Sequence, residues 1–272
     1  MKKYFQDKVI VITGGGAGLG QALAIEMAHH NARIFVLDIN KNWAKETSEM
    51  ILQNGGKASY YQVDVTDFEQ LSDIIEKIYK TEGKIDILIN NAGISVTGEV
   101  RDMHLKHWSK AINLNLMGVI HGITIVYPKM VKQGFGQIVN IASMAGLAPV
   151  PFISPYVTSK YAVVGLSRSL RLEAQGLGVK VNLVCPGRLN TSILDHSMMV
   201  NVDKKKLQSN VPFNAMPLTK AVNKILKGIV INKSLIIFPP YVRWLWLADR
   251  YFPLILKPFY RYSIKQFRKM RE

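Results

Sequence analysis

The chain has 272 residues, with 35 lysines and arginines, 19 aspartates and glutamates, and a single cysteine. Hydrophobic residues make up 48% and charged residues 20%, which is typical of a globular protein and excludes a disordered one. One cysteine excludes an internal disulfide framework, and with six scattered histidines it offers no zinc-ligand spacing, so we expect no metal site. At about 150 residues per domain, the length allows one large domain or two small ones.

The net charge of +16 is concentrated toward the carboxyl end. Residues 1–199 hold 20 basic and 16 acidic residues, whereas residues 200–272 hold 15 basic and 3 acidic. Such a basic segment fits an anionic membrane surface, nucleic acid or simple solubility. The uncharged stretch 234–242 near this end has nine residues, and a membrane-spanning helix needs about 20. The apolar run 9–12 is too short for a signal peptide. We therefore expect a cytoplasmic protein that is soluble or peripheral on a membrane surface.

Strand-like apolar runs alternate with helical patterns along the chain. We predict strands at 8–13, 33–38, 58–64, 85–90, 136–142, 179–184 and 234–238. Helices are predicted at 20–30, 42–53, from the third strand to about 81, at 103–132 with a break near Pro128, and at 156–175. Continuous apolar strands joined by helices indicate a parallel sheet covered on both faces. The sequence thus predicts a single doubly wound α/β domain over residues 1–240, with a seven-stranded parallel sheet, and a C-terminal helical extension over 241–272.

A glycine-rich loop follows the first predicted strand and opens the next helix. It reads TGGGAGLG from Thr13, and Gly14, Gly18 and Gly20 have the spacing G-x3-G-x-G. Glycine lets the backbone turn sharply and lets a pyrophosphate approach the helix N-terminus, where free N–H groups favour anions. Because strand, loop, helix and second strand fall in order, we predict a dinucleotide site here rather than a flexible turn.

Asp38 ends the second predicted strand, 20 residues after Gly18. An acid at this place accepts hydrogen bonds from both hydroxyls of an adenosine ribose and repels a 2′-phosphate. No basic residue lies inside the glycine loop, and Ile39 and Asn40 follow the acid. The sequence therefore favours NAD over NADP. An ordinary turn or helix-capping role for Asp38 is the alternative.

A second motif pairs a tyrosine with a lysine. Tyr156 and Lys160 are four residues apart, so one helix face holds both, and Ser143 follows the fifth predicted strand. Tyrosine is a suitable acid/base only if its pKa falls from about 10 toward neutrality. We expect the positive charge of Lys160 to favour the tyrosinate. This motif occurs by chance in many helices, but its combination with the glycine loop indicates a site.

With these motifs, the sequence resembles a classical short-chain dehydrogenase/reductase over about residues 5–240. Further matches are the motif VDV around Asp64, NNAG from Asn90 to Gly93, NLNLMGV around Asn115, and Pro186-Gly187 followed by Thr191. The resemblance implies a Rossmann domain that transfers hydride to or from the nicotinamide of NAD. The cofactor-binding residues that it implies are Gly14, Gly18, Leu19, Gly20, Asp38, Asp64, Val65, Asn91, Ala92, Gly93, Tyr156, Lys160, Pro186, Gly187, Leu189 and Thr191.

The resemblance also implies four catalytic residues. Tyr156 would be the acid/base, Lys160 would bond the nicotinamide ribose, Ser143 would hold the substrate oxygen, and Asn115 would order a water that relays protons from Lys160. Cys185 is expected to be buried packing and not a nucleophile. A homodimer or homotetramer is implied, with pairing through the long helices around Asn115 and Tyr156.

The resemblance implies a substrate lid over 188–220. Its apolar residues suit an irregular apolar ligand, and ordinary packing of the lid is the alternative. They are Ile193, Leu194, Met198, Met199, Val200 and Phe213.

The extension interleaves aromatic and basic residues, as in YVRWLWLADRYF, and we expect Pro253 and Pro258 to break its helix into short pieces. Such a segment suits a membrane surface; the alternatives are covering the substrate mouth or contacting a partner subunit. No nucleic-acid recognition module accompanies the basic residues, so we expect no nucleic-acid partner.

Together these features predict an NAD-dependent oxidoreductase that interconverts a secondary or allylic alcohol and a carbonyl. The extension resembles those of family members that act on steroids, retinoids and long-chain lipids, which favours an apolar substrate. The alternatives are a soluble reductase of small metabolites and a non-catalytic NAD-sensing protein that docks to a membrane or partner.

Overall fold

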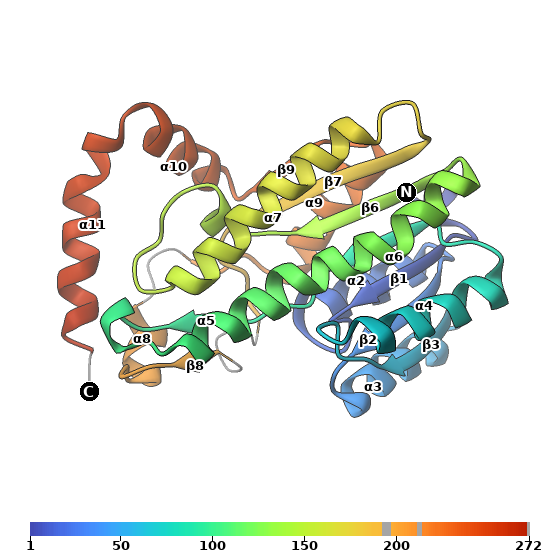
Figure 1. Cartoon of the computed structure of the whole chain (residues 1–272), viewed down its shortest axis with the longest axis horizontal. Helices are drawn as coiled ribbons and strands as arrows, with labels where there is room; N and C mark the ends of the chain where they lie inside the picture. The colour runs from blue at the N-terminus through green and yellow to red at the C-terminus, as the bar shows by residue number, and fades with distance from the viewer. Residues whose placement is uncertain (192–196, 211–213, 271–272) are drawn as a thin grey trace.

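Seven parallel strands form the central sheet, in the order β3-β2-β1-β4-β6-β7-β9 (Figure 1). The computed structural model describes residues 1–191, 197–210 and 214–270. The strands are β1 (Val9–Thr13), β2 (Arg33–Asp38), β3 (Lys57–Gln62), β4 (Ile87–Asn90), β6 (Gly136–Ile141), β7 (Val179–Pro186) and β9 (Leu235–Phe238). The predicted seven-stranded parallel sheet is confirmed. Successive strands are added toward one edge from β1 to β3 and toward the other edge from β4 onward, so the strand order has a switch point between β1 and β4. Ligands bind at such switch points in doubly wound sheets.

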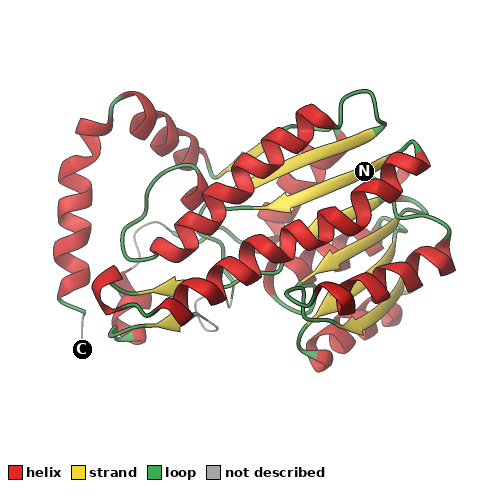
Figure 2. Ribbon diagram, viewed as in Figure 1, coloured by secondary structure: helices red, strands yellow, loops and turns green. Residues whose placement is uncertain are grey.

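Helices cover both faces of the sheet (Figure 2). One face packs against α4 (Phe68–Glu82), α6 (Gly118–Gln133) and α7 (Ser154–Glu173). The other packs against α2 (Gly18–His29), α3 (Lys41–Gln53) and α9 (Leu218–Val230). In α4 the buried residues Leu71, Ile75 and Ile78 recur at helical spacing. The short helix α1 (Lys2–Phe5) buries Phe5 against the second face.

The long helical region differs from the prediction in its break. It consists of α5 (Leu105–Ile112), a π-helical turn (Asn113–Met117) and α6. The expected break near Pro128 is wrong, because α6 continues through that residue. Its neighbours Val126 and Met130 are fully buried, and this packing holds the helix although a proline cannot donate the backbone hydrogen bond. The discontinuity lies at the π-turn, around the buried Asn115.

Within the part of the chain that the structure describes, one helical run, Leu105–Gln133, is long and apolar enough to span a membrane. Its second half, α6, contacts β4, β6 and α4. The apolar residues of that half are thus accounted for by packing on the sheet.

Two small elements lie beside the sheet edge where the strands end. Strands β5 (Val96–Thr97) and β8 (Met198–Met199) pair in parallel, and α8 (Lys204–Asn210) follows. Two-residue strands are too short for a periodic pattern, so the sequence did not predict them. Two 3₁₀ turns, Val100–Asp102 and Met144–Gly146, complete the connections.

The extension forms two helices joined by a sharp turn, α10 (Pro240–Tyr251) and α11 (Pro253–Arg268), and we call this pair the hairpin; α10 leads away from the sheet and α11 stands at the left edge of Figure 1. Pro253 occupies the first turn of α11, where its missing N–H costs nothing. Pro258 lies inside α11, so the prediction that it breaks the helix is wrong. Phe267 is buried with Val202 and stacks on Phe152, with ring centroids 3.6 Å apart. The far end of the hairpin is therefore fastened to the domain.

Candidate active site

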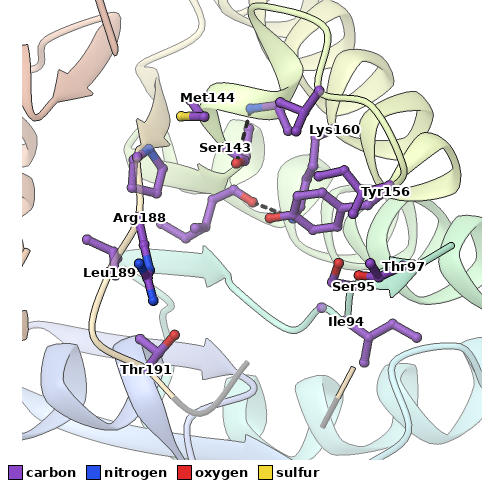
Figure 3. Close-up of a pocket in the computed structure, with 18 of the residues that line it drawn as sticks. Ile94, Ser95, Thr97, Ser143, Met144, Tyr156, Lys160, Arg188, Leu189 and Thr191 are labelled. Carbon is purple, nitrogen blue, oxygen red and sulfur yellow. Dashed lines mark hydrogen bonds between the residues drawn. The ribbon is translucent and has the colours of Figure 1, made fainter. Parts of the chain in front are cut away.

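One cavity of about 1230 Å³ opens at the carboxyl ends of the central strands. Segments after β1, β2, β3, β4, β6 and β7 line it, together with α11. All the predicted site residues line it except Gly20 and Asn115. Figure 3 shows Ser143, Tyr156 and Lys160 on one side of this cavity and Leu189 and Thr191 on another.

The glycine loop has the backbone shape that requires glycine at two positions. Gly14 has φ +60° and Gly18 has φ +54°, in the left-handed region. A Cβ on Gly20 would lie 2.1 Å from the carbonyl oxygen of Gly14, so the helix start packs directly on the loop. Gly18 faces Thr191, the nearest atom being 3.6 Å from an added Cβ. The predicted sharp turn therefore agrees with the geometry at Gly14 and Gly18, and the packing of Gly20 on Gly14 is a further reason for glycine that the sequence did not predict.

Hydrogen bonds fasten the loop to the end of β4. The side-chain amide of Asn91 donates to the carbonyl oxygens of Thr13 and Gly14, at 3.1 and 2.9 Å. The hydroxyl oxygen of Thr13 accepts from the backbone N–H groups of Asn91 and Ala92, at 3.0 and 3.2 Å. The NNAG segment and the glycine loop thus form one rigid unit.

Asp38 is 8% exposed and holds the loop from the side of β2. Its Oδ2 accepts from the N–H of Gly16 and its Oδ1 from the N–H of Asn40, both at 2.9 Å. Each carboxylate oxygen has a second lone pair, which leaves acceptor capacity toward the cavity. The neighbouring lining residues Ile39 and Trp43 carry no positive charge. Trp43 was not predicted as a site residue, because one tryptophan in a helical pattern does not indicate that it lines a cavity.

The segment that follows β3 contributes Asp64 and Val65. The Oδ1 of Asp64 accepts from the N–H and the hydroxyl of Thr66, at 2.9 and 2.8 Å, which fixes the turn. The carbonyl oxygen of Val65 lies 2.9 Å from a ring nitrogen of His121 in α6. Both residues line the same end of the cavity as Asp38.

Ser143, Tyr156 and Lys160 line the same cavity as the glycine loop. Ser143 follows β6, and its hydroxyl oxygen accepts from the N–H of Ala145 at 3.2 Å. Tyr156 and Lys160 occupy the first two turns of α7. The Nζ of Lys160 donates to the carbonyl oxygen of Ile141 at 2.9 Å and lies 5.6 Å from the centroid of the Tyr156 ring. The spacing predicted from the sequence thus brings the three side chains together.

The electrostatics of this pair differ from the expectation. Burial raises the pKa of Tyr156 above its ordinary value, and a hydrogen bond from Ser143 opposes the rise. Burial also lowers the pKa of Lys160 to about 8. The expected fall in the tyrosine pKa is therefore absent, because loss of hydration dominates and the ammonium is directed at Ile141. At neutral pH this arrangement holds a protonated phenol.

Cys185 lies at the end of β7, fully buried beneath this site. Burial raises the pKa of its thiol to about 12. A thiol in this state is a poor nucleophile. The prediction that Cys185 is packing is confirmed.

Asn115 stands behind the cavity wall and is completely buried in the π-helical turn. Its Oδ1 accepts from the N–H of Ile94 at 2.8 Å, and its Nδ2 donates to the carbonyl oxygen of Ile94 and to the hydroxyl of Ser159, both at 3.0 Å. The amide thereby ties the segment after β4 to α7. Its geometry is that of a residue that positions the active-site wall.

The segment after β7 is held by the extension. The N–H of Gly187 donates to the carbonyl oxygen of Phe238 at 2.7 Å, and the N–H of Arg188 donates to the hydroxyl of Tyr241 at 3.1 Å. A Cβ on Gly187 would lie 2.5 Å from that hydroxyl. The first turn of α10 therefore packs directly on the segment after β7. No sequence motif predicts this contact.

The lid differs from the expectation in the part that is described. Met198, Met199 and Val200 do not line the cavity: the two methionines form β8, and Val200 packs with Val96. Ile193, Leu194 and Phe213 lie outside the described residues. Two other residues of the predicted lid, Leu207 and Ala215, do line it. The loop before α7 adds residues that the sequence did not predict, namely Ala148, Pro149, Val150, Pro151, Phe152 and Ile153. Residues of α11 also line the cavity, in keeping with the alternative that the extension covers the substrate mouth; they are Phe259, Tyr260, Tyr262, Ser263, Gln266, Phe267 and Met270.

Comparison with known proteins is consistent with this geometry. A family model described as short chain dehydrogenase matches residues 8–199. An uncharacterized oxidoreductase of Thermotoga maritima is 36% identical over 217 residues, covering 78% of this chain and 85% of the relative. Estradiol 17-beta-dehydrogenase 11 of Mus musculus is 30% identical over 255 residues, covering 93% of this chain and 82% of the relative. The crystal structure of a short chain dehydrogenase/reductase from Burkholderia phymatum in complex with NAD superimposes with a TM-score of 0.85 at 26% identity, covering 92% of this chain and 95% of that one.

Proposed function

The chain belongs to the short-chain dehydrogenase/reductase family, and we propose that it is an NAD-dependent enzyme that interconverts a secondary or allylic alcohol and a carbonyl on an apolar substrate. The family assignment makes it an oxidoreductase acting on CH–OH groups with a nicotinamide cofactor. One observation carries the finer proposal: a single cavity is lined by the glycine loop and Asp38 and also by Ser143, Tyr156 and Lys160.

The residues present fit a dinucleotide. The first turn of α2 has no side-chain cap and no acidic residue, so its N–H groups face the cavity beside Gly18. An uncapped helix start of this kind favours a pyrophosphate. Asp38 would accept from the ribose hydroxyls, and its negative charge supports NAD over NADP. When bound, NAD supplies the two-electron hydride acceptor or donor of the reaction.

The proton chemistry follows from the side chains. In carbonyl reduction, the neutral Tyr156 donates its hydroxyl proton to the carbonyl oxygen while the hydroxyl of Ser143 donates a hydrogen bond to the same oxygen. In alcohol oxidation, Tyr156 must first lose its proton. Lys160 holds its ammonium against Ile141, within reach of the cofactor side of the site. Asn115 holds the segment after β4 against α7, the helix that carries Tyr156 and Lys160.

The substrate end of the cavity supports an apolar ligand such as a steroid, retinoid or long-chain lipid. Its walls are the apolar loop of Pro149, Val150 and Pro151 and the aromatic residues of α11. The name of the mouse relative, an estradiol dehydrogenase, is in keeping with an apolar alcohol. A small polar metabolite would leave most of this wall uncovered.

For the assembly and location we propose a homodimer, paired through α6 and α7, in the cytoplasm and peripheral on a membrane surface. Exposed apolar residues on α7, Tyr161 and Leu172, support the pairing. The exposed aromatic residues of the extension support the membrane contact.

The test is turnover followed by the near-ultraviolet absorbance of reduced nicotinamide, with NAD and NADP run separately. The panel runs from short alcohols to steroids, retinol and long-chain hydroxy-lipids, with Tyr156→Phe as the blank. Turnover with NAD and bulky apolar alcohols supports the proposal. Turnover restricted to small polar alcohols would discard the apolar substrate and keep the enzyme. Cofactor binding without any turnover across the panel would favour a dinucleotide-sensing protein.

A further inference from the structure

We propose that the turn between α10 and α11 docks on a negatively charged lipid bilayer and thereby presents the substrate cavity to the membrane. The proposal deepens the membrane contact proposed above and, for its second part, rests on the proposed function. We name the surface formed by Trp244, Tyr251, Phe252, Leu254 and Ile255 the apolar tip. These five side chains are exposed, from 62% for Phe252 to 72% for Trp244.

The apolar tip is continuous in space along the hairpin. Trp244 and Tyr251 are seven residues apart and share one face of α10, while Phe252 joins the two helices. Leu254 and Ile255 follow in the first turn of α11. Figure 1 places this turn at the edge of the molecule, away from the sheet. An exposed cluster of large apolar side chains marks an interaction site.

Both ends of the hairpin pack against the domain, so the side chains of the apolar tip are not needed to hold the hairpin in place. At the start of α10, Val242 is buried and Tyr241 accepts from the N–H of Arg188. At the end of α11, Phe267 stacks on Phe152, and the Nε of Arg268 lies 3.1 Å from an oxygen of Glu99. The tip is the part of the hairpin that these contacts leave uncovered.

The positive charge around the apolar tip indicates which kind of partner it binds. The extension, residues 241–272, carries eight basic and two acidic residues. Lys257, Arg261 and Lys265 are exposed and recur every four residues, on one face of α11. The acid nearest to the tip, Asp249, lies 3.4 Å from the hydroxyl of Tyr260. Aromatic and aliphatic side chains flanked by basic ones fit the interface of a bilayer that contains anionic lipid.

The same helix connects the docking surface to the cavity. Phe259, Tyr260, Ser263 and Phe267 line the cavity from α11, within one to four turns of Leu254 and Ile255. A docked tip therefore holds the aromatic wall of the substrate end at the lipid interface. An apolar alcohol dissolved in the membrane would reach the cavity along α11 without crossing bulk water.

The first experiment is co-sedimentation of the full chain with phosphatidylcholine vesicles, with and without about 30% phosphatidylserine. We expect the anionic vesicles to bind the protein more tightly, and about 1 M salt to remove the difference, because the screening length then falls to about 3 Å. The double variant Leu254→Ser/Ile255→Ser should lower partitioning more than tenfold. The double variant Lys257→Gln/Arg261→Gln should lower it about fivefold for each charge on anionic vesicles and leave it unchanged on neutral ones.

Matched controls carry the same changes elsewhere on the surface. Leu52→Ser/Ile231→Ser removes two exposed apolar side chains, and Lys224→Gln/Lys227→Gln removes two exposed charges on α9. Equal loss of binding in these controls would overturn the docking surface. So would equal binding of the protein to neutral and anionic vesicles. Sedimentation velocity tests the rival occupant: an oligomer that dissociates in Leu254→Ser/Ile255→Ser, with no vesicle binding of the unmodified chain, would make the tip an interface between copies.

A second arm separates docking from the reaction. Turnover of a long-chain secondary alcohol carried in anionic vesicles should fall at least tenfold in Leu254→Ser/Ile255→Ser, while turnover of a short soluble alcohol stays unchanged. An equal fall with both alcohols would place the defect in the site and overturn presentation to the membrane. Vesicle binding without turnover of either alcohol would instead count against the proposed function and leave the docking surface standing.

Discussion

Lys160 offers a direct test of the electrostatics of the site. Burial lowers its pKa from 10.5 to about 8. Below about pH 8 the lysine is protonated in both the folded and the unfolded chain, so it adds no pH dependence there. Between about pH 8 and 10.5 the unfolded chain holds the proton and the folded chain has released it. Stability rises with pH wherever the unfolded state binds more protons. The contribution of Lys160 to the free energy of unfolding should therefore grow by about 2 to 3 kcal/mol between about pH 7 and pH 10.

The comparison of the unmodified protein with Lys160→Met isolates this contribution. Urea unfolding followed by tryptophan fluorescence gives the free energy of each at several pH values, since the chain has four tryptophans. The variant leaves the carbonyl oxygen of Ile141 unpaired, which shifts its stability by a constant that does not depend on pH. Lys180→Met, at an exposed position of β7, is the control. A wild-type-minus-variant difference that stays flat from about pH 7 to 10 would refute the buried, proton-releasing lysine.

Three further variants test the parts of the cavity. Tyr156→Phe should lower turnover by about 10²–10⁴-fold, the usual contribution of a general acid or base, and change the dissociation constant of NAD less than about twofold; persistent turnover would remove Tyr156 as the acid/base. Asp38→Arg should shift the ratio of kcat/KM values for NADP and NAD toward NADP by about tenfold or more, with Asp38→Asn as the size-matched partner that removes only the charge; an unchanged ratio counts against the role of Asp38. Gly20→Ala should abolish NAD binding in a fluorescence titration, because its Cβ would lie 2.1 Å from the oxygen of Gly14, whereas Gly165→Ala in α7, with nothing within 4 Å, should bind NAD normally; normal binding by both would contradict the packing of the loop.

The fold could be predicted from the sequence because its signals are local. The strand 33–38 matches β2, and each of the seven predicted strands has a counterpart in the sheet. A run of β-branched and aliphatic residues buried on both faces leaves few other structures open. The prediction at Pro128 failed for the opposite reason. Helix continuity there depends on packing of α6 against other elements through its buried residues Val126 and Met130, and a local pattern does not contain that packing. At Pro258 the neighbouring residues 257–259 are exposed, so such packing does not explain why α11 continues.

The candidate site divides in the same way. The shape of the glycine loop could be predicted, because the sharp turn at Gly14 and the close approach at Gly20 follow from the backbone geometry that a phosphate loop requires. The wall that holds Pro151 and Tyr262 could not be derived from spacing, because these residues are far apart in the sequence and line one cavity only in the folded chain. The sequence also did not predict the direction in which the pKa of Tyr156 shifts. The spacing shows that Lys160 lies on the same helix face as Tyr156. The effect of its charge on the tyrosine pKa, however, depends on burial and on the hydrogen bond from Lys160 to the carbonyl oxygen of Ile141.

This division bears on how substrate choice is built into the protein. The cofactor end consists of strand ends that the sheet fixes, whereas α11, one wall of the substrate end, lies outside the sheet and packs through Phe267 and Arg268. The family model ends at residue 199, before α10 begins. Relatives that share the glycine loop and Tyr156 can therefore differ in the wall that contacts the substrate. Because part of the apolar tip and part of the cavity wall lie on α11, the proposed membrane docking and the proposed choice of substrate would both depend on this helix.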